Sequence, residues 1–489
     1  MPRPWQLVLD VERDTARPPF LQIAHALIDE IQRGRLRPGD RLPGSRQLAD
    51  SLHVHRNTVL AALAELIAEG WVETTPARGT FVTRAIVNTR GRPLSRRLAL
   101  HTQVSSHVPF TLPEAPAAYR PPNLPSGTLN LSHGAPDLRL VPSRAIGRAY
   151  RRVLALRGAD VLGYGDPEGD AALRAALASM LSSTRGLSVR PDDVLVTRGS
   201  QMALTLSARA LLRPGDAVAV EQLGYRPAWE AFRAAGATVV PVAIDREGID
   251  IEALVRLADR AAIRAVYVTP HHQYPTTVTL KAARRLALLA FARARRIAIV
   301  EDDYDHEFHY DGRPVLPLAS ADHAGLVVYI GTLSKILAPA LRIGYIVAPP
   351  AVLRTIGAIR SLVDIQGDLA TEAAVATLIE DGELQRHVAR ARRVYANRRE
   401  ILANLLRRAF GESVQFKVPS GGMALWVHFE MPVDVDAWAE RSLERGVAWY
   451  TGRRYAFDRR SKPFARFNFA ALNERELPEA VRRMAAALP

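Results

Sequence analysis

The sequence predicts two folded parts: a small α+β domain near the N-terminus and a larger α/β domain built on a mostly parallel sheet. Three observations predict this class. The chain has 489 residues, more than one hydrophobic core usually holds. Short helical patterns and a hairpin occupy residues 18–84, whereas strand-like apolar runs alternate with helical patterns over residues 128–489. The residues between, 85–127, are rich in arginine, proline and serine and are expected to be a linker.

The composition excludes several classes of protein. There is no cysteine, so disulfides, cysteine nucleophiles and cysteine-ligated zinc are excluded. No apolar run reaches the roughly 18 residues of a membrane span, and the first residues lack the apolar core of a signal peptide. We therefore expect a cytoplasmic protein with no membrane partner. A net charge of +15 favours a polyanionic partner. The alternative explanation of the charge is a proteome with a general bias toward arginine.

Two helices of the small domain have the spacing of a helix-turn-helix. The turn PGDRLPG leads to a short helix at about 45–52, and a second helix follows at about 56–69. In helix-turn-helix proteins, side chains on the first turn of the second helix reach base edges. Arg56, Asn57 and Thr58 occupy those positions. Arginine suits guanine and asparagine suits adenine, each through two hydrogen bonds.

The segment WVETTPARGTFVTR then predicts a β-hairpin in which Arg78 can reach a phosphate or the minor groove. A small helical domain that binds protein is the alternative at this point. However, the strings PGDRLPGSRQLA, HRNTVLAALAEL and RGTFV closely resemble the GntR-type winged helix-turn-helix domain. The resemblance implies double-stranded operator DNA as partner. It makes Arg46 and Arg56 the main contacts, supported by Asn57, Thr58 and Arg78.

In the large domain, the run IGTLSKILAPALRIGY places Lys335 in a polar turn after a predicted strand. A lysine that forms a Schiff base must lose its proton near neutral pH, and burial lowers its pKa. Thr332 and Arg342 supply a hydroxyl and a guanidinium, which are groups that bind a phosphate. A surface turn without function is the alternative for this run.

A second run, AIVEDDYDHEFHY, carries Asp302 and Tyr304 at the end of a predicted strand. A carboxylate there can hold a pyridinium N–H, and a tyrosine nearby can bond a ring phenolate. The alternative is a cation site or a solvated loop. The acidic and histidine side chains of this run lack a recognised ligand spacing, so no metal ion is expected.

Two further segments also place candidate binding residues directly after a predicted strand. Ser200 and Gln201 open a predicted helix directly after a strand, where backbone N–H groups and a hydroxyl can bind an anion. Tyr225 also follows a strand, and it can either stack on a ring or pack in the core.

These segments occur in the order found in fold-type I pyridoxal-phosphate enzymes, and this resemblance covers about 130–489. The whole chain resembles the MocR/GabR family, in which a GntR-type domain precedes an aminotransferase-like domain. The strings that carry the resemblance are LSHGAPD, LGYGDPEG, GSQ, HHQYPTT, EDDYDHEF, GTLSKILAPALRIGY, SGGMALWV and RFNFA. The resemblance implies a pyridoxal-phosphate-dependent transferase fold with a smaller C-terminal α+β subdomain, and pyridoxal 5'-phosphate as cofactor.

The resemblance also implies roles for individual residues. Lys335 forms the Schiff base with the cofactor, Asp302 pairs with the pyridine nitrogen, and Tyr304 bonds the ring oxygen. Tyr225 stacks on the ring. Arg466 clamps the carboxylate of an amino-acid-type effector, as a planar guanidinium suits.

The phosphate of the cofactor is bound, by the same resemblance, through Ser200, Gln201, Thr332 and Arg342. Tyr164 reaches the phosphate of the neighbouring subunit, which implies a homodimer. Two departures put full catalytic competence in doubt. Aminotransferases carry Asn-Pro-Thr-Gly where this chain has Tyr274-Pro275-Thr276-Thr277, and Asn468 stands where the family often has glycine.

The sequence thus predicts a DNA-binding transcriptional regulator whose promoter binding is modulated by pyridoxal phosphate or by its aldimine with an amino-acid-type effector. The alternative is an active aminotransferase with an appended DNA-binding domain. The intact DNA-facing arginines and the departures at Tyr274 and Thr277 favour the regulator. A further alternative makes pyridoxal phosphate itself the signal. A dimer should read a repeated or palindromic half-site.

Overall fold

A computed structural model of the chain describes residues 18–85, 110–112, 123–132, 134–312 and 315–489. The chain divides into two compact units, Met1–Leu112 and Pro113–Pro489. Most of the predicted linker lies outside the described residues. Among the helices that are described, none is both long enough and apolar enough to cross a membrane.

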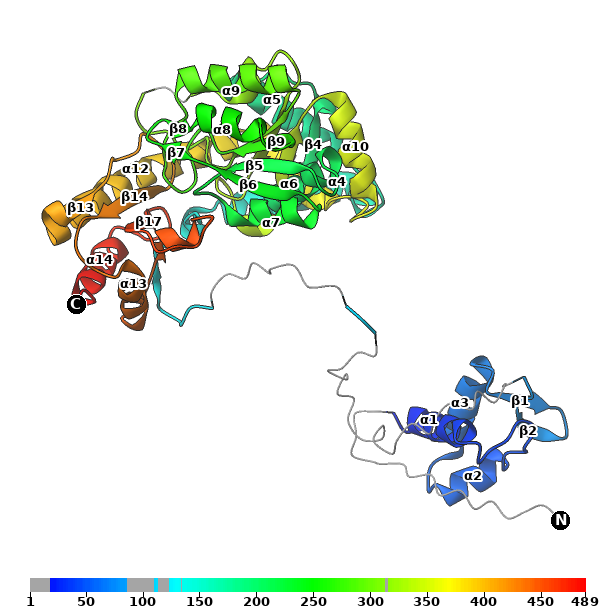
Figure 1. Cartoon of the computed structure of the whole chain (residues 1–489). Coiled ribbons are helices and arrows are strands. Elements are labelled where there is room, and N and C mark those ends of the chain that lie inside the picture. The colour runs from blue at the N-terminus through cyan, green and yellow to red at the C-terminus, as the bar shows by residue number, and fades with distance from the viewer. Residues whose placement is uncertain (1–17, 86–109, 113–122, 133, 313–314) are drawn as a thin grey trace. The chain divides into compact units, whose positions relative to one another are not determined.

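Three helices and a β-hairpin make up the described part of the N-terminal unit (Figure 1). They are α1 (Pro19–Gln32), α2 (Ser45–Ser51), α3 (Arg56–Ala68), β1 (Val72–Thr75) and β2 (Gly79–Val82). The two strands pair antiparallel, and both predicted helix-turn-helix boundaries agree within one residue. The helices pack on a buried apolar core formed by Ile23, Leu27, Leu48, Val59, Leu66 and Val82. The winged helix-turn-helix fold is therefore confirmed.

A seven-stranded sheet forms the centre of the larger unit (Figure 1). Its order is β4-β12-β11-β10-β9-β5-β6. The strands are β4 (Val194–Thr197), β5 (Ala217–Glu221), β6 (Thr238–Val242), β9 (Ile263–Val268), β10 (Ala298–Asp303), β11 (Val327–Thr332) and β12 (Gly344–Val347). Strand β12 runs antiparallel to both neighbours, β4 and β11. All other neighbouring pairs are parallel, as the alternation of strands and helices predicted.

Helices cover both faces of this sheet. One buried cluster joins one face to α6 (Ser200–Leu211), α7 (Arg226–Ala234) and α10 (Pro350–Ser361). The other cluster joins the opposite face to α5 (Ala171–Arg185), α9 (Ala282–Arg295), α11 (Leu369–Glu380) and α12 (Glu383–Phe410). Figure 1 shows α9 and α7 on opposite sides of the sheet.

The two faces divide the end of β10 between them. In this strand, Val300 belongs to the first cluster and Ile299 to the second. Side chains alternate along a strand, so Asp302 and Asp303 point to opposite faces. The polar side chains at the end of β10 are therefore divided between the two faces of the sheet.

A smaller α+β subdomain follows, as the family resemblance implied. Its four-stranded sheet has the order β13-β14-β17-β16, with antiparallel neighbours. The elements are β13 (Val414–Gln415), β14 (Ala424–Phe429), α13 (Val435–Glu444), β16 (Tyr450–Thr451), β17 (Phe464–Asn468) and α14 (Glu476–Ala486). The remaining elements are β3 (Leu129–Asn130), α4 (Ser143–Leu162), β7 (Ile244–Asp245), β8 (Gly248–Ile249), α8 (Ile251–Ala258) and β15 (Val447–Ala448).

Candidate functional site

Neighbouring strand ends bring the predicted site residues together in the large unit. Asp302 is the second-last residue of β10, and Thr332 ends the adjacent β11. Lys335 follows β11 by three residues, and Ser200 begins α6 directly after β4. Because parallel strands point their carboxyl ends to one edge, ligands of open α/β sheets bind there. Arg466 comes from β17 of the smaller subdomain.

The Lys335 amine lies among cations in a buried setting. A Cβ placed on Gly134 would lie 3.8 Å from Lys335 Nζ and 3.7 Å from Nη1 of Arg466. Burial lowers the pKa of Lys335 to about 8, and the positive charge of Arg466 contributes to that lowering. An amine with this pKa is partly neutral near physiological pH, as a Schiff-base lysine requires.

Asp302 has one satisfied and one unsatisfied carboxylate oxygen. The hydroxyl of Tyr267 donates to Oδ2 at 2.8 Å, whereas Oδ1 is buried without a hydrogen-bond partner. Burial raises the pKa of Asp302 to about 7. A buried acceptor without a donor is costly, so this oxygen suits the N–H of a bound pyridinium ring.

The start of α6 has features that suit an anion. Gly199 precedes the helix with φ +79°, and a Cβ there would lie 2.7 Å from Nη2 of Arg342. That nitrogen donates to the carbonyl of Arg198 at 2.9 Å. Glycine therefore serves here both for its backbone conformation and for the approach of the guanidinium. The helix N-terminus and the exposed Arg342 together favour a phosphate.

Two predicted phosphate ligands make other contacts. The hydroxyl of Thr332 accepts the backbone N–H of Ser334 at 3.1 Å, which shapes the turn before Lys335. Gln201 donates from Nε2 to the carbonyl of Pro227 at 3.0 Å, while its Oε1 is buried without a partner. Gln201 thus ties the start of α6 to α7 in this structure.

Three tyrosines, Tyr225, Tyr274 and Tyr304, lie close together, and Arg466 lies beside one of them. The ring of Tyr274 lies 5.5 Å from Tyr225 and 5.9 Å from Tyr304 between centroids. The Arg466 guanidinium lies 4.8 Å from the Tyr274 ring centroid. Arg466 is 1% exposed, yet its Nε and Nη1 lack hydrogen-bond partners. Buried guanidinium donors without acceptors suit an anionic group such as a carboxylate. The Tyr304 hydroxyl donates to the His272 carbonyl at 2.9 Å.

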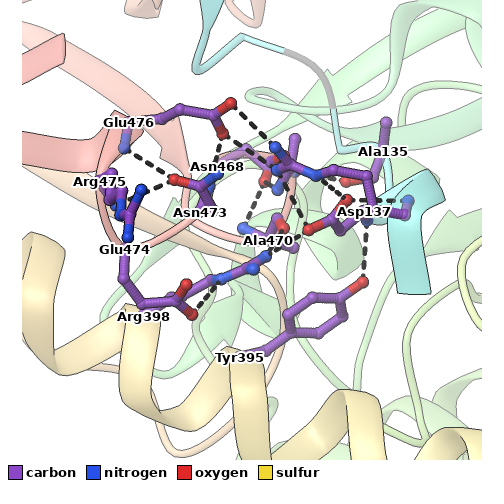
Figure 2. Close-up of polar contacts among 12 residues, drawn as sticks. Ala135, Asp137, Tyr395, Arg398, Asn468, Ala470, Asn473, Glu474, Arg475 and Glu476 are labelled. Atoms are coloured by element: carbon purple, nitrogen blue, oxygen red, sulfur yellow. Dashed lines mark hydrogen bonds and ion pairs between the residues drawn. The ribbon is translucent and has the colours of Figure 1, made fainter. Parts of the chain in front are cut away.

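A polar network holds the segment that carries Gly134 (Figure 2). Asp137 accepts from Arg398 at 2.9 Å, and its backbone N–H donates to the Tyr395 hydroxyl at 2.9 Å. Arg398 also donates to the Ala470 carbonyl at 2.7 Å and to Glu474 at 2.9 Å. The network therefore joins α12, the end of β17 and the segment before α4. It holds the segment that carries Gly134 beside the turn that follows β17, the strand of Arg466.

The two sequence departures differ in how far the structure accounts for them. Thr277 has φ +63°, a conformation in which glycine is unstrained and a β-branched residue is rare. Its backbone N–H donates to the Gln273 carbonyl at 2.7 Å. Asn468 is fully buried, and its Oδ1 accepts the N–H groups of Ala470 and Ala471 at 2.7 and 3.0 Å. Asn468 therefore shapes the turn after β17.

The residues present fit pyridoxal phosphate. Asp302 Oδ1 offers an unsatisfied acceptor for a ring N–H, and Lys335 offers an amine of lowered pKa. Arg342 and the start of α6 form a cradle that a Cβ on Gly199 would fill. Sequence reasoning missed Tyr267 and Gly134. A tyrosine inside a buried strand and a lone glycine carry no signal of a ligand without knowledge of their distant neighbours.

The predicted DNA-facing residues lie together on the small unit. Arg46, Arg56, Asn57 and Arg78 are exposed, and Thr58 is half-buried. Arg56 Nε donates to Ser45 Oγ at 3.3 Å, which links the starts of α2 and α3. The Asn57 backbone N–H donates to the His55 ring at 3.2 Å, so His55 caps α3.

Comparison with known proteins agrees with both units. The family described as Bacterial regulatory proteins, gntR family, matches residues 19–82, and Aminotransferase class I and II matches residues 126–484. The probable rhizopine catabolism regulatory protein MocR of Rhizobium meliloti is 31% identical, over 98% of this chain and 95% of its own length. The HTH-type transcriptional regulator TauR of Rhodobacter capsulatus is 32% identical, over 96% of each chain.

Solved structures resemble the larger unit. The α-aminoadipate aminotransferase LysN of Thermus thermophilus, complexed with N-(5'-phosphopyridoxyl)-L-leucine, is 31% identical with a TM-score of 0.69. The match covers 74% of this chain and 92% of LysN. The gntR-family domain implies DNA binding, and the aminotransferase fold is one that uses pyridoxal phosphate. The chain therefore belongs to the MocR family of transcriptional regulators, in which a gntR-family winged helix-turn-helix precedes an aminotransferase class I and II domain.

Proposed function

We propose that promoter binding by this regulator responds to pyridoxal phosphate held by Lys335 and to an amino-acid-type effector held by Arg466. One observation carries the proposal. Around Lys335, Asp302 and Arg466 are both buried, and each keeps polar atoms without a protein partner. Asp302 keeps one acceptor, which suits the N–H of a pyridinium ring. Arg466 keeps two donors, which suit a carboxylate.

Each side chain has a defined task in this proposal. Bound pyridoxal phosphate supplies an aldehyde that reacts with amines. Lys335 offers the amine, because its pKa of about 8 leaves a neutral fraction at physiological pH. Asp302 holds the ring N–H, Tyr225 packs on the ring, and Tyr304 lies at its oxygen. Ser200, Gln201, Thr332 and Arg342 belong to the phosphate end.

Coupling to DNA follows from linkage. An effector changes DNA affinity only if it binds two arrangements of the chain with different affinity. An amino-acid amine that takes the place of Lys335 on the cofactor would free this side chain beside Gly134 and Arg466. Residues 85–127 are the proposed linker between the DNA-binding and ligand-binding domains, at residues 18–84 and 128–489.

We also propose a homodimer, supported by an exposed apolar patch. The patch consists of Leu156, Leu162, Tyr164, Leu362, Val363 and Ile365, and Tyr164 and Leu362 are 88% and 89% exposed. Its two segments are tied together, because Gln366 contacts the backbone of Gly165 and Gly163. Contiguous exposed apolar surface marks an interaction site. In the proposed dimer, Tyr164 contributes to the site of the partner.

The deciding experiment combines cofactor absorbance and DNA binding in the same samples. We expect a Schiff-base absorbance band in the full chain that is lost in Lys335→Ala and kept in Lys281→Ala, a change at an exposed lysine. We expect DNA affinity to change when cofactor or amines are added, in the wild type and in Lys281→Ala but not in Lys335→Ala. Absence of the band would overturn the cofactor assignment. A band with unchanged DNA affinity would overturn the regulatory coupling.

Aminotransferase activity is the second candidate, favoured by the combination of Lys335, Asp302 and Arg466 in one site. Steady formation of a keto acid from an amino acid, with DNA affinity indifferent to ligands, would establish this candidate. We expect no steady turnover. If pyridoxal phosphate is the sole signal, the DNA affinity should change when the cofactor is added and should not change further when amines are added.

A further inference from the structure

Four histidines meet beside the ligand site, after the ends of β9 and β10. His271 and His272 follow β9, and His306 and His309 follow β10. The ring centroid of His271 lies 4.3 Å from that of His272, 4.5 Å from that of His306 and 6.3 Å from that of His309. None of the four is more than 9% exposed. Polar rings this close and this buried need partners, because a polar group taken out of water is costly without one.

Three of these rings, those of His271, His306 and His309, have both nitrogens buried without a hydrogen bond. Of the three, His306 lies 3.0 Å from the Asp303 carboxylate, whereas His271 and His309 form no ion pair among the described residues. A neutral imidazole has one N–H donor and one nitrogen with a free lone pair. That lone pair is the group by which histidine binds metal ions.

The ligand atoms are close enough to share one ion. One possible ligand atom from each of His271, His272 and His309 lies within 4.8 Å of the others. Zn–N bonds of about 2.0–2.1 Å in tetrahedral geometry place ligand nitrogens roughly 3.3 Å apart. Side-chain shifts on the order of 1 Å would therefore complete the geometry. A second group, His271, Asp303 and His306, meets the same distance limit.

The environment favours the three-histidine group. Asp305 Oδ1 lies 2.8 Å from His272 Nδ1, which leaves Nε2 of that ring for an ion. A carboxylate on the second nitrogen is the usual support of a metal-binding histidine. Asp303, in contrast, already lies 3.0 Å from His306 and 3.8 Å from the buried Arg185 guanidinium, whose charge disfavours a cation.

We propose that His271, His272 and His309 bind a divalent transition metal ion, with Asp305 positioning His272. Three imidazoles favour Zn²⁺, Ni²⁺, Co²⁺ or Cu²⁺ over Mg²⁺ or Ca²⁺, which prefer oxygen ligands. The site is one hydrogen bond from the ligand site, because the His272 carbonyl accepts from Tyr304. The proposal concerns metal binding and is independent of pyridoxal phosphate.

The test measures Zn²⁺ retained by the untagged full-length protein after excess ion is removed by gel filtration, with and without pyridoxal phosphate. We expect one ion per chain and its loss in His309→Gln and in His271→Ala. The exposed His323→Gln and the neighbouring His306→Gln should retain the ion. Replacement by Co²⁺ should give the visible absorption of a tetrahedral ion, and Asp305→Asn should weaken binding about 10–100-fold.

Circular dichroism and DNA binding report whether each variant folds. If His271→Ala does not fold, the Zn²⁺ retained by His309→Gln decides whether the proposal holds. A wild-type protein that retains no ion overturns the proposal. Retention in His309→Gln at wild-type affinity, or loss in His306→Gln instead, overturns it as well. The cofactor band is recorded separately, so a failure of the metal site is distinguishable from a failure of the proposed function.

Discussion

The DNA-reading surface and the ligand site are built in opposite ways. Arg46, Arg56 and Arg78 lie within one short stretch of sequence and are exposed. The ligand site joins Gly134, Asp302, Lys335 and Arg466 from distant parts of the chain, and it buries Asp302 and Arg466. Cations that face solvent carry no desolvation cost in the DNA-free protein. Buried groups without partners destabilise the ligand-free fold, and the surrounding network has to offset that cost.

The comparison separates two kinds of arginine. Arg56 is exposed on the small unit, whereas Arg398 and Arg466 are both buried in the larger unit, at 3% and 1% exposed. Arg398 has carboxylate and carbonyl partners (Figure 2), and two nitrogens of Arg466 have none. We infer that Arg398 serves the fold and Arg466 serves the ligand. The predictions test this division.

The largest effect is expected from Arg398→Met. Removing one partner from a buried ion-pair network costs about 3–5 kcal/mol, and here Asp137 would lose a charged donor. Thermal or denaturant unfolding followed by near-UV circular dichroism measures the loss. Arg393→Met, on the exposed side of the same helix, is the control and should change stability by less than about 0.5 kcal/mol. Equal stability of the two variants would show that the network does not hold the site.

A smaller effect is expected from Arg56→Ala on DNA affinity. Loss of one two-hydrogen-bond contact to a base costs about 1–3 kcal/mol, or roughly 5–150-fold in Kd. Fluorescence anisotropy with a site selected from random double-stranded DNA measures it. Arg33→Ala, at the end of α1 and paired with Asp29, is the matched control. The cofactor band should be unaltered in both, and a change in that band would contradict the separation of the two regions.

The reactivity of Lys335 should depend on pH with a midpoint of about 8. The chain has only four lysines, so mass spectrometry can follow reductive methylation of each one in cofactor-free protein. The exposed Lys281 and Lys417 are the internal comparison. Because folding lowers the pKa of Lys335, the folded state should also gain stability as pH rises from about 8 toward 10. Lys335→Met should remove this gain. A midpoint near 10 would show that the amine is not desolvated.

The same contrast explains what the sequence could predict. The helix-turn-helix was accessible because its functional residues are neighbours on two short helices. Lys335, Asp302 and Thr332 were accessible because each follows a predicted strand of a parallel sheet, whose ends meet. Tyr267, Gly134 and the histidine cluster were not, because their meaning depends on contacts between segments far apart in sequence. The antiparallel direction of β12 was equally hidden, since strand periodicity does not encode direction.

The smallest effect on stability is expected from Arg466→Met, and its smallness is informative. Replacing a buried charge by an apolar side chain of similar volume is often neutral or stabilising, because the desolvation cost disappears. The contact of Arg466 with the Tyr274 ring offsets part of this gain, by about 0.5–2 kcal/mol. We therefore expect the free energy of unfolding of Arg466→Met to lie within about 1 kcal/mol of that of the wild type, in contrast to Arg398→Met. The variant should nevertheless lose any stabilisation that amino acids give to the cofactor-loaded protein, measured by thermal unfolding. A loss as large as that of Arg398→Met would mean that Arg466 holds the fold, and that the carboxylate of an effector binds elsewhere.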